Sequence, residues 1–417
     1  MKRLVILGAG TAGTILANRV QARLPRDWEV TVVEPAANHL YQPGLLLLPF
    51  GDIDELSLRR PREHTLDAQI EWRQSEVQSV LPALRKVVLA DSELDYDLLV
   101  IASGARVRPD LTPGLARERG HFDVCDFYTL EGARTLRDTL DVFNEGRLIV
   151  DVVEAPIKGP LAPLEFLFIA DDHFRRRGIR DRVELVYATP LEDAYGGPLG
   201  AAPFTELLVA KGIELVPGFA AEDVDRARHK LRAKDGRALA YDLLVPVPTH
   251  SGAAFVERSG IGDARGFVPT ESGTLRASRI EDAWVLGDAT DLPSAKAGSV
   301  AHLQAEFLAE ALLAQMRGSH SAAALDARGT CFVDTGEGRG MLLDFGEAET
   351  RPGSYPLPGI GPFTFLRPSR RNHWGKNAVR GLYWDTVLRG KGMPLPKRLR
   401  SRPERQAGTK GARSRTS

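Results

Sequence analysis

The sequence is poor in cysteine and contains no long apolar run. Cys125 and Cys331 are its only cysteines among 417 residues, which excludes a fold held together by several disulfide bonds. No run of about 18 apolar residues is present, so we expect no membrane-spanning helix. The formal net charge is zero, and a chain without a basic excess has no general attraction for nucleic acid. We therefore expect no nucleic-acid partner.

The two ends of the chain are also informative. A strand-like segment begins directly after Met1, so we expect no signal peptide and a location on the cytoplasmic side of a membrane. The last segment, residues 396–417, is rich in lysine and arginine and contains Glu404 as its only acid. We expect this basic tail to be disordered, because it has few of the apolar residues that a core requires.

The N-terminal segment carries a glycine motif in a specific context. An apolar strand over 2–7 runs directly into Gly-x-Gly-x-x-Gly, and a helical pattern over 12–23 follows. In such a turn the first glycine permits a tight bend, the second lets the backbone approach a pyrophosphate, and the third lets helix and strand pack closely. We therefore predict that the turn binds a dinucleotide. Its candidate contacts are Gly8, Gly10, Thr11, Ala12 and Gly13.

Two further segments support this interpretation. Glu34 ends the next predicted strand, over 28–34, where a carboxylate can accept hydrogen bonds from ribose hydroxyls. The strand over 96–104 is apolar on both faces, which is typical of a central parallel strand. It ends in Ala102, Ser103 and Gly104, which we assign to the same site. The alternative is a purely structural glycine turn with a solvated Glu34.

A second α/β half follows, without a second glycine motif. Its predicted elements are a strand over 147–153, a helix over 161–177, a strand over 182–187, a helix over 201–211, a strand over 212–216 and a hairpin over 229–247. The connection after the first strand contains Pro156, Pro160, Pro163 and the single glycine Gly159. Three prolines and one glycine do not make a pyrophosphate-binding turn. We expect one dinucleotide in all, although a diverged nicotinamide site is the alternative.

The dinucleotide is predicted to be FAD from a motif far along the chain. Gly287 and Asp288 follow an apolar strand over 283–286, where a carboxylate can meet the ribitol of an extended FAD. Lys296 precedes a predicted helix from Gly298, and positive charge there stabilises an anionic reduced flavin. Alone, a Gly-Asp pair is a common turn. Together with the N-terminal motif it favours FAD.

These patterns predict an α/β fold with two Rossmann-like, three-layer dinucleotide-binding domains and a C-terminal region that is β-rich and contains an amphipathic helix. The predicted units are residues 1–110 with 251–315 for a discontinuous FAD-binding domain, 111–250 for the second domain, 316–395 for the C-terminal region and 396–417 for the tail.

Several motifs make residues 1–390 resemble the two-dinucleotide-domain flavoproteins, and specifically the sulfide:quinone oxidoreductase branch. Besides the motifs above, they are His39-Leu-Tyr41-Gln-Pro43, Pro156–Phe168, Pro293–Ser299 and Cys331-Phe-Val-Asp-Thr-Gly336. The resemblance implies FAD as cofactor, sulfide or a related sulfur species as reductant, a quinone as acceptor and a peripheral membrane position. It also places Pro43 and Val77 near the cofactor. It implies no metal site and leaves a homo-oligomer open.

The resemblance assigns redox roles to three residues. Cys331 matches the C-terminal redox cysteine of the family, and Cys125 approximately matches an upstream one. Such chemistry uses a thiolate of low pKa beside the flavin. Glu165 matches an acid that moves protons near the flavin or quinone, and its apolar helix predicts a raised pKa. The alternatives are buried, inert cysteines and an exposed Glu165.

The chain departs from the family at two positions. Gly159 stands where the partner cysteine is expected, and Pro198 stands where some members carry a histidine. Three interpretations follow. Cys331 works with Cys125, or Cys331 acts with an external thiol, or the chain uses another reductant. The function hypotheses are accordingly a sulfide:quinone oxidoreductase-like enzyme, an NAD(P)H:quinone dehydrogenase, or a redox-silent flavin-binding protein.

The segment 363–390 mixes aromatic residues with arginines. This composition suits a membrane interface with anionic headgroups, and the C-terminal region would then face the membrane and the quinone, with the basic tail adding attraction. The alternative is a helix that covers the core.

Overall fold

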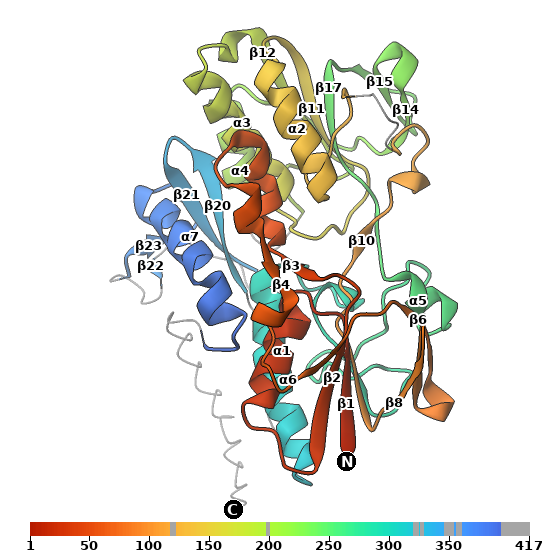
Figure 1. Cartoon of the computed structure of the whole chain (residues 1–417). Coiled ribbons are helices and arrows are strands. Elements are labelled where there is room, and N and C mark those ends of the chain that lie inside the picture. The colour runs from red at the N-terminus through yellow and green to blue at the C-terminus, as the bar shows by residue number, and fades with distance from the viewer. Residues whose placement is uncertain are drawn as a thin grey trace, which may run out of the picture.

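The computed structural model describes residues 1–116, 122–196, 201–319, 325, 329–345, 354–355 and 361–392. Two open α/β sheets lie one above the other in Figure 1, and a C-terminal hairpin with a helix lies along their flank. This arrangement confirms the predicted α/β class with two Rossmann-like halves. The domain boundaries stay a prediction, and the tail 396–417 lies outside the described residues.

The first sheet is parallel and has the order β19-β9-β1-β2-β5. Its strands are β1 (Lys2–Leu7), β2 (Trp28–Val33), β5 (Glu71–Arg73), β9 (Leu98–Ile101) and β19 (Ala283–Val285). Successive side chains of a strand point to opposite faces, so Leu4 and Ile6 of β1 pack with α1 (Thr11–Gln21) and α6 (Gly298–Met316). Val5 and Leu7 pack instead with the meander on the other face. That meander consists of β6 (Val77–Leu81), β7 (Lys86–Leu89) and β8 (Glu93–Asp95).

The second sheet repeats this three-layer plan with the parallel order β13-β12-β11-β17. Its strands are β11 (Gly146–Val152), β12 (Val183–Ala188), β13 (Glu214–Val216) and β17 (Leu243–Val247). Three helices share one core with the sheet: α2 (Leu130–Val142), α3 (Ala162–Arg176) and α4 (Ala202–Ala210). The opposite face packs against the antiparallel strands β14 (Ala221–Asp225), β15 (Lys230–Ala233) and β16 (Ala238–Ala240).

Short elements join these units. The antiparallel pair β10 (Arg106–Val107) and β18 (His250–Ser251) links the two sheets. Strands β3 (Asn38–Leu40) and β4 (Arg59–Pro61) form an antiparallel pair in the segment between β2 and β5. Helix α5 (Ala254–Arg258) packs against β6.

The C-terminal region is built on the antiparallel hairpin of β20 (Thr330–Gly336) and β21 (Arg339–Asp344). Helix α7 (Arg370–Leu382) packs on this hairpin and continues into a π-helical turn, Tyr383–Val387. The small pair β22 (Ser354–Tyr355) and β23 (Phe363–Thr364) completes the region. Strand β20 also packs on α3, so the hairpin lies between the second domain and α7.

Most predicted elements are confirmed, with three differences. Helix α2 was missed, although Thr129 caps it by accepting a hydrogen bond from the Gly132 N–H. The predicted hairpin over 229–247 is wrong at its end. Within this segment β15 pairs with β16, whereas β17 pairs with β11 in the parallel sheet. The aromatic residues of 363–390 mostly turn inward. Phe363, Phe365 and Tyr383 are buried, whereas Trp374 is 67% exposed.

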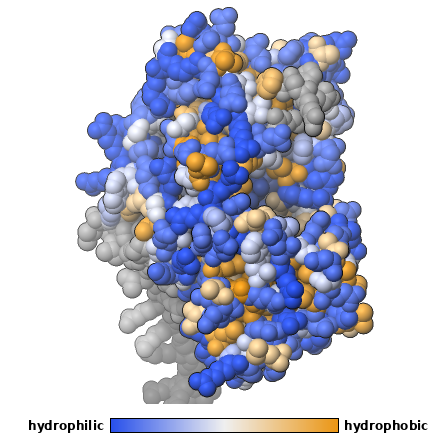
Figure 2. All heavy atoms as spheres, viewed as in Figure 1, coloured by the Kyte–Doolittle hydropathy of each residue, from blue (hydrophilic) through white to orange (hydrophobic). Residues whose placement is uncertain are grey.

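On the face shown in Figure 2, hydrophilic residues predominate and apolar residues gather in separate groups. Within the described ranges, no helix combines the length and apolar character that crossing a bilayer requires. The same residues contain no cluster of three or more His, Cys, Asp or Glu side chains arranged to hold a metal ion.

Candidate cofactor and redox site

The glycine turn is shaped by backbone close approach. A Cβ added to Gly13 would lie 2.0 Å from the Gly8 carbonyl oxygen, and one added to Gly8, whose φ is +103°, would lie 2.6 Å from the Ala102 carbonyl oxygen. A Cβ on Gly10 would meet open space instead. Gly10 is also the N-cap of α1 and offers no side-chain cap to the first-turn amides. The turn therefore keeps uncapped amides and open space where a pyrophosphate would bind.

Glu34 lies beside this turn, as predicted. Its carboxylate accepts hydrogen bonds from the Ala9 N–H and the Ala36 N–H, each at 3.0 Å. These backbone contacts hold the carboxylate at the carboxyl end of β2, where its remaining lone pairs can accept from ribose hydroxyls.

Ser103 supplies a second sign that the site is made for a ligand. Its buried Oγ has no hydrogen-bond partner among the described residues, which is uncommon for a buried polar atom. Ser103 follows β9 directly, and its Cα would lie 3.0 Å from a Cβ on Gly8. The predicted group Ala102, Ser103 and Gly104 thus adjoins the turn.

The distant Gly287–Lys296 segment reaches the same place. A Cβ on Gly287 would lie 3.2 Å from the Ala12 Cβ, so the Gly-Asp turn adjoins the first turn of α1. Lys296 Nζ donates to the carbonyl oxygens of Asp288 (3.0 Å) and Thr290 (2.7 Å). Burial lowers the pKa of Lys296, whereas the Asp288 carboxylate opposes that shift. The residues present fit FAD, because uncapped amides, the Glu34 carboxylate and Lys296 all lie at the carboxyl end of the first sheet.

Two predicted contacts are less direct. The Val77 side chain packs in the core with Val5 and Leu7, and its carbonyl accepts a hydrogen bond from Arg258 at 3.0 Å. Pro43 lies in a short 3-10 helix, Gln42–Leu46, which faces the second domain through a 3.1 Å hydrogen bond from Lys158 Nζ to Gln42 Oε1. Their contacts with the cofactor stay predictions.

The loop around Gly159 lies against the FAD-binding half. The Gly159 N–H donates to the Lys296 carbonyl oxygen at 2.7 Å, and a Cβ at this position would touch only the Ala162 Cβ, at 3.5 Å. Gly159 has φ of +62°, so glycine suits the local backbone. The position expected to carry a partner cysteine is therefore beside the cofactor segment and carries no thiol. Pro198 lies outside the described residues.

Cys331 lies on β20 opposite Leu343 and packs against the core of the second domain. Burial raises the pKa of the Cys331 thiol to about 12. The described groups around it supply no cation that offsets this shift, so the protein alone favours the thiol. The expectation of a thiolate with a low pKa is not met by these protein groups.

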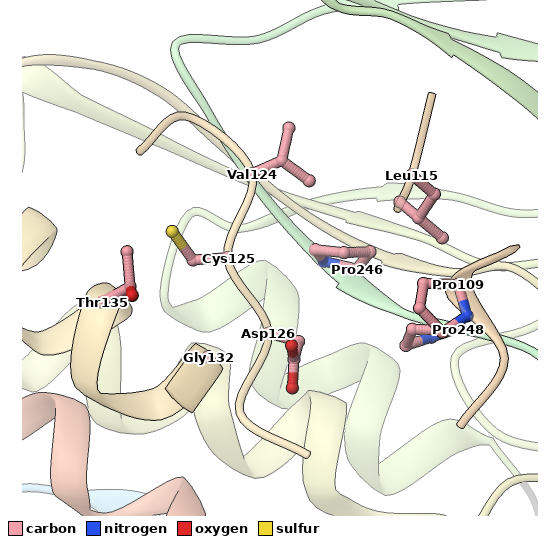
Figure 3. A pocket seen from close by; sticks show the side chains of 9 residues that line it. All are labelled: Pro109, Leu115, Val124, Cys125, Asp126, Gly132, Thr135, Pro246 and Pro248. Carbon is pink, nitrogen blue, oxygen red and sulfur yellow. The ribbon is translucent and has the colours of Figure 1, made fainter. Parts of the chain in front are cut away.

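Cys125 occupies a different environment. It is buried, and its thiol donates to the Phe122 carbonyl oxygen at 3.3 Å. Figure 3 shows its sulfur on the side of Thr135 in a small cavity of about 40 Å³. The cavity is lined by Pro109, Leu115, Val124, Cys125, Asp126, Gly132, Thr135, Pro246 and Pro248. Both cysteines are free thiols, and they form no disulfide with each other.

Glu165 is at the centre of a buried ionic cluster that sequence reasoning did not find. It is 7% exposed, so the alternative of an exposed acid is wrong. Its Oε1 accepts from the Asp334 N–H at 3.0 Å and pairs with Lys376. Lys376 Nζ also lies 2.8 Å from Asp334 Oδ2, and His373 Nδ1 lies 2.6 Å from Asp334 Oδ1. The one signal in the sequence was Lys376, which is the single lysine among the arginines of α7.

Burial shifts the pKa values of two members of this cluster. Burial, together with the Arg380 guanidinium, lowers the pKa of Lys376 to about 7, while Asp52 opposes the shift. Burial raises the pKa of Asp334, which His373 opposes. Groups whose pKa values approach the working pH can release and take up protons readily.

A cavity of about 320 Å³ adjoins the cluster. Arg380 lies on its wall and donates to the Asp52 carbonyl oxygen at 3.5 Å. The lining residues are Tyr41, Asp52, Ile53, Asp54, Ser57, Arg380 and Trp384. Two aromatic rings and one aliphatic side chain thus share the wall with four polar or charged residues.

Comparison with known proteins agrees with this geometry. The sequence profile of the pyridine nucleotide-disulphide oxidoreductase family matches residues 2–141. The mitochondrial sulfide:quinone oxidoreductase of Mus musculus is 24% identical, with 93% of this chain and 86% of that protein covered. The structure of the sulfide:quinone oxidoreductase from Aquifex aeolicus superposes with a TM-score of 0.79 at 17% identity, covering 94% of this chain and 92% of that one. The alternative NAD(P)H-ubiquinone oxidoreductase C1 of Arabidopsis thaliana is 27% identical, but over 54% of this chain and 46% of that protein.

The fold and the site thus define an FAD-dependent oxidoreductase. Residues 2–141 match the pyridine nucleotide-disulphide oxidoreductase family, and most of the chain is similar to sulfide:quinone oxidoreductases.

Replacing Gly10 by alanine should separate folding from cofactor binding. The added methyl meets open space in the protein, so the thermal midpoint of the FAD-free protein should stay unchanged. The same methyl occupies the approach to the pyrophosphate, so FAD should bind at least about tenfold more weakly, measured by flavin fluorescence titration. Gly381→Ala, which also enters open space but on α7, is the matched control. Equal FAD affinities for the two variants would contradict the assignment of the turn.

Proposed function

We propose that the protein oxidises a sulfide-type sulfur species and reduces a membrane quinone, with FAD between them. The observation that carries this proposal is the geometry of β20. Successive residues of a strand point to opposite faces, so Cys331 packs toward the second domain while the Asp334 carboxylate meets α7. One strand therefore presents a thiol on one side and a proton-exchanging cluster on the other.

When bound, FAD supplies two-electron transfer between a reductant and an acceptor. On the donor side, Cys331 is the residue proposed to bind the sulfur of the reductant. Because Gly159 supplies no partner thiol and Cys125 lies elsewhere, Cys331 would act with an external thiol or with sulfide itself. A cation or the cofactor must then stabilise its thiolate, since burial alone favours the thiol.

On the acceptor side, the quinone is proposed to enter the cavity lined by Tyr41 and Trp384. Reduction of a quinone to a quinol takes up two protons. Lys376 is proposed to deliver one of them, and Glu165 and Asp334 to recharge it, because all three are joined by direct contacts. Arg380 connects the cluster to the cavity wall.

A peripheral membrane position completes the proposal. Trp374 on α7 is 67% exposed, and Leu56, in the 3-10 helix Glu55–Leu58 beside the cavity, is 75% exposed. Arg370 and Arg371 at the start of α7 can contact anionic headgroups. These features support contact between the cavity mouth and a lipid surface, from which a quinone would come.

An NAD(P)H:quinone dehydrogenase is the second candidate, favoured by the partial relatives of that kind. The connection after β11 argues against it. The Gly159 N–H donates a hydrogen bond to the Lys296 carbonyl oxygen, and α3 begins at Ala162 with Pro163 in its first turn. This connection lacks the glycines that would let a second pyrophosphate approach.

Anaerobic titration of the yellow holoenzyme should decide between these donors. We expect sulfide to bleach the flavin absorbance within seconds, whereas NADH at the same concentration should leave it unchanged. Rapid bleaching by NADH would reverse the ranking. Bound FAD that neither donor reduces would favour a redox-silent flavin protein.

Cys331→Ser should slow flavin reduction by sulfide at least about a hundredfold, because a serine hydroxyl does not replace a sulfur nucleophile. The measurement is stopped-flow absorbance at the flavin band. Thr330→Ser on the same strand controls for disturbance of β20, and it should keep the wild-type rate. An unchanged rate in the Cys331 variant would refute the role, and an equal loss in Cys125→Ser would instead favour the two cysteines acting as a pair.

Reoxidation of the reduced enzyme by a water-soluble quinone should slow as the pH rises through about 7, because Lys376 loses the proton that it delivers. Lys376→Arg should flatten this profile, since a guanidinium keeps its proton. Glu165→Gln should move the midpoint to lower pH, because it removes an anion that stabilises the protonated amine. Arg371→Gln, exposed on α7, is the control. A wild-type profile in Lys376→Arg would exclude Lys376 as the donor.

A further inference from the structure

A buried hydrogen-bond chain connects the C-terminal segment to the glycine turn. Tyr383 Oη lies 2.8 Å from Thr11 Oγ1 and 2.8 Å from His39 Nε2. Tyr383 is 7% exposed and is the first residue of the π-helical turn that follows α7. The tyrosine and the threonine are 372 positions apart in the sequence.

The tautomer of His39 sets the direction of these hydrogen bonds. Its Nδ1 lies 3.2 Å from the Ala9 carbonyl oxygen, to which it can donate, and 3.3 Å from Arg62 Nη1, from which it can accept. Burial and the neighbouring Arg62 lower the pKa of His39 to about 3, which keeps the imidazole neutral. His39 Nε2 therefore accepts from the Tyr383 hydroxyl in one tautomer and donates to it in the other. In both tautomers Tyr383 Oη is hydrogen-bonded to Thr11 Oγ1.

The N-cap of α1 is Gly10, which has no side chain to hold the first turn in place. Thr11 is the first residue of α1, and its contact with Tyr383 positions that turn from outside the first domain.

The residues after Tyr383 follow α1 further. Asn18 Nδ2 donates to the Leu388 carbonyl oxygen at 2.7 Å, and Arg19 Nη1 donates to the Gly390 carbonyl oxygen at 2.6 Å. We call residues 383–390 the C-terminal strap. The strap is therefore hydrogen-bonded to α1 at three places along its length.

We propose that Tyr383 is a positioning residue of the FAD-binding turn and that the C-terminal strap is part of the cofactor site. Tyr383 orients Thr11 and thereby the amides of the first turn of α1 that receive the pyrophosphate. The inference concerns the cofactor alone and goes beyond the proposed reaction, so it holds whichever donor reduces the enzyme.

The test is FAD binding to the cofactor-free protein, measured by fluorescence titration, with thermal unfolding of the same samples. We expect Tyr383→Phe to weaken FAD binding about tenfold, since it removes a hydrogen-bond partner from the buried His39 and from the half-buried Thr11 at the turn. Tyr241→Phe removes the hydroxyl of another buried tyrosine, in the second domain, and should leave FAD affinity unchanged. Equal losses in both variants, or no loss in Tyr383→Phe, would overturn the proposal.

A double-mutant cycle with Thr11 tests whether Tyr383 acts through it. Thr11→Val should weaken binding, Thr11→Ser should restore it, and Thr11→Val with Tyr383→Phe should be no weaker than the weaker single variant, because the two residues share one interaction. Additive losses would overturn the mechanism. If Tyr383→Phe does not fold, the comparison of Thr11→Val with Thr11→Ser still decides, since equal FAD affinities there also overturn it.

Hydrogen exchange gives the reciprocal measurement. Coupling between two sites acts in both directions, so FAD binding should slow amide exchange in residues 383–390. Exchange in β14–β16 of the second domain should not change. Equal exchange in the strap with and without FAD would contradict the coupling, irrespective of any result with sulfide or quinone.

Discussion

The close approach of two backbones at Gly8 and Gly13 is the constraint on which the rest of the structure depends. Only hydrogen atoms fit where side chains would lie 2.0–2.6 Å from carbonyl oxygens, so α1 can start directly above β1 and β9. This contact creates the open, uncapped turn at Gly10. Around it lie Glu34, Ser103, Gly287 and the strap, which are far apart in the sequence.

A second constraint is the burial of charge between α3, β20 and α7. Buried ionic groups are tolerated when they are paired, and removing one partner of such a pair typically costs about 3–5 kcal/mol because the other charge is left uncompensated. Glu165, Asp334 and Lys376 satisfy one another, so the cluster holds the C-terminal helix against the second domain. The same burial brings the pKa of Lys376 to about 7, so the lysine that helps hold α7 in place is also the proposed proton donor. Helix α7 then continues into the strap, so the acceptor side and the cofactor turn share one element.

The proposed donor side differs from the proposed acceptor side in how few reactive groups the protein supplies. Position 159 has room and no thiol, Cys125 lies under α2, and burial favours the neutral form of Cys331. An external sulfur species suits such a site better than a mechanism that requires a disulfide within the protein.

Much of this protein follows from local sequence spacing. The glycine turn, the apolar strands and the helices α1, α3, α4 and α6 depend on residues that are close in the chain, so periodicity and turn chemistry predict them. The pairing of Glu165 with Lys376 joins residues 211 positions apart, and that of Thr11 with Tyr383 joins residues 372 apart. No local pattern encodes such contacts. The sequence alone therefore predicts a dinucleotide site at Gly8–Gly13. Only the tertiary structure decided which distant side chains complete that site, because long-range packing selects the partners of buried polar groups.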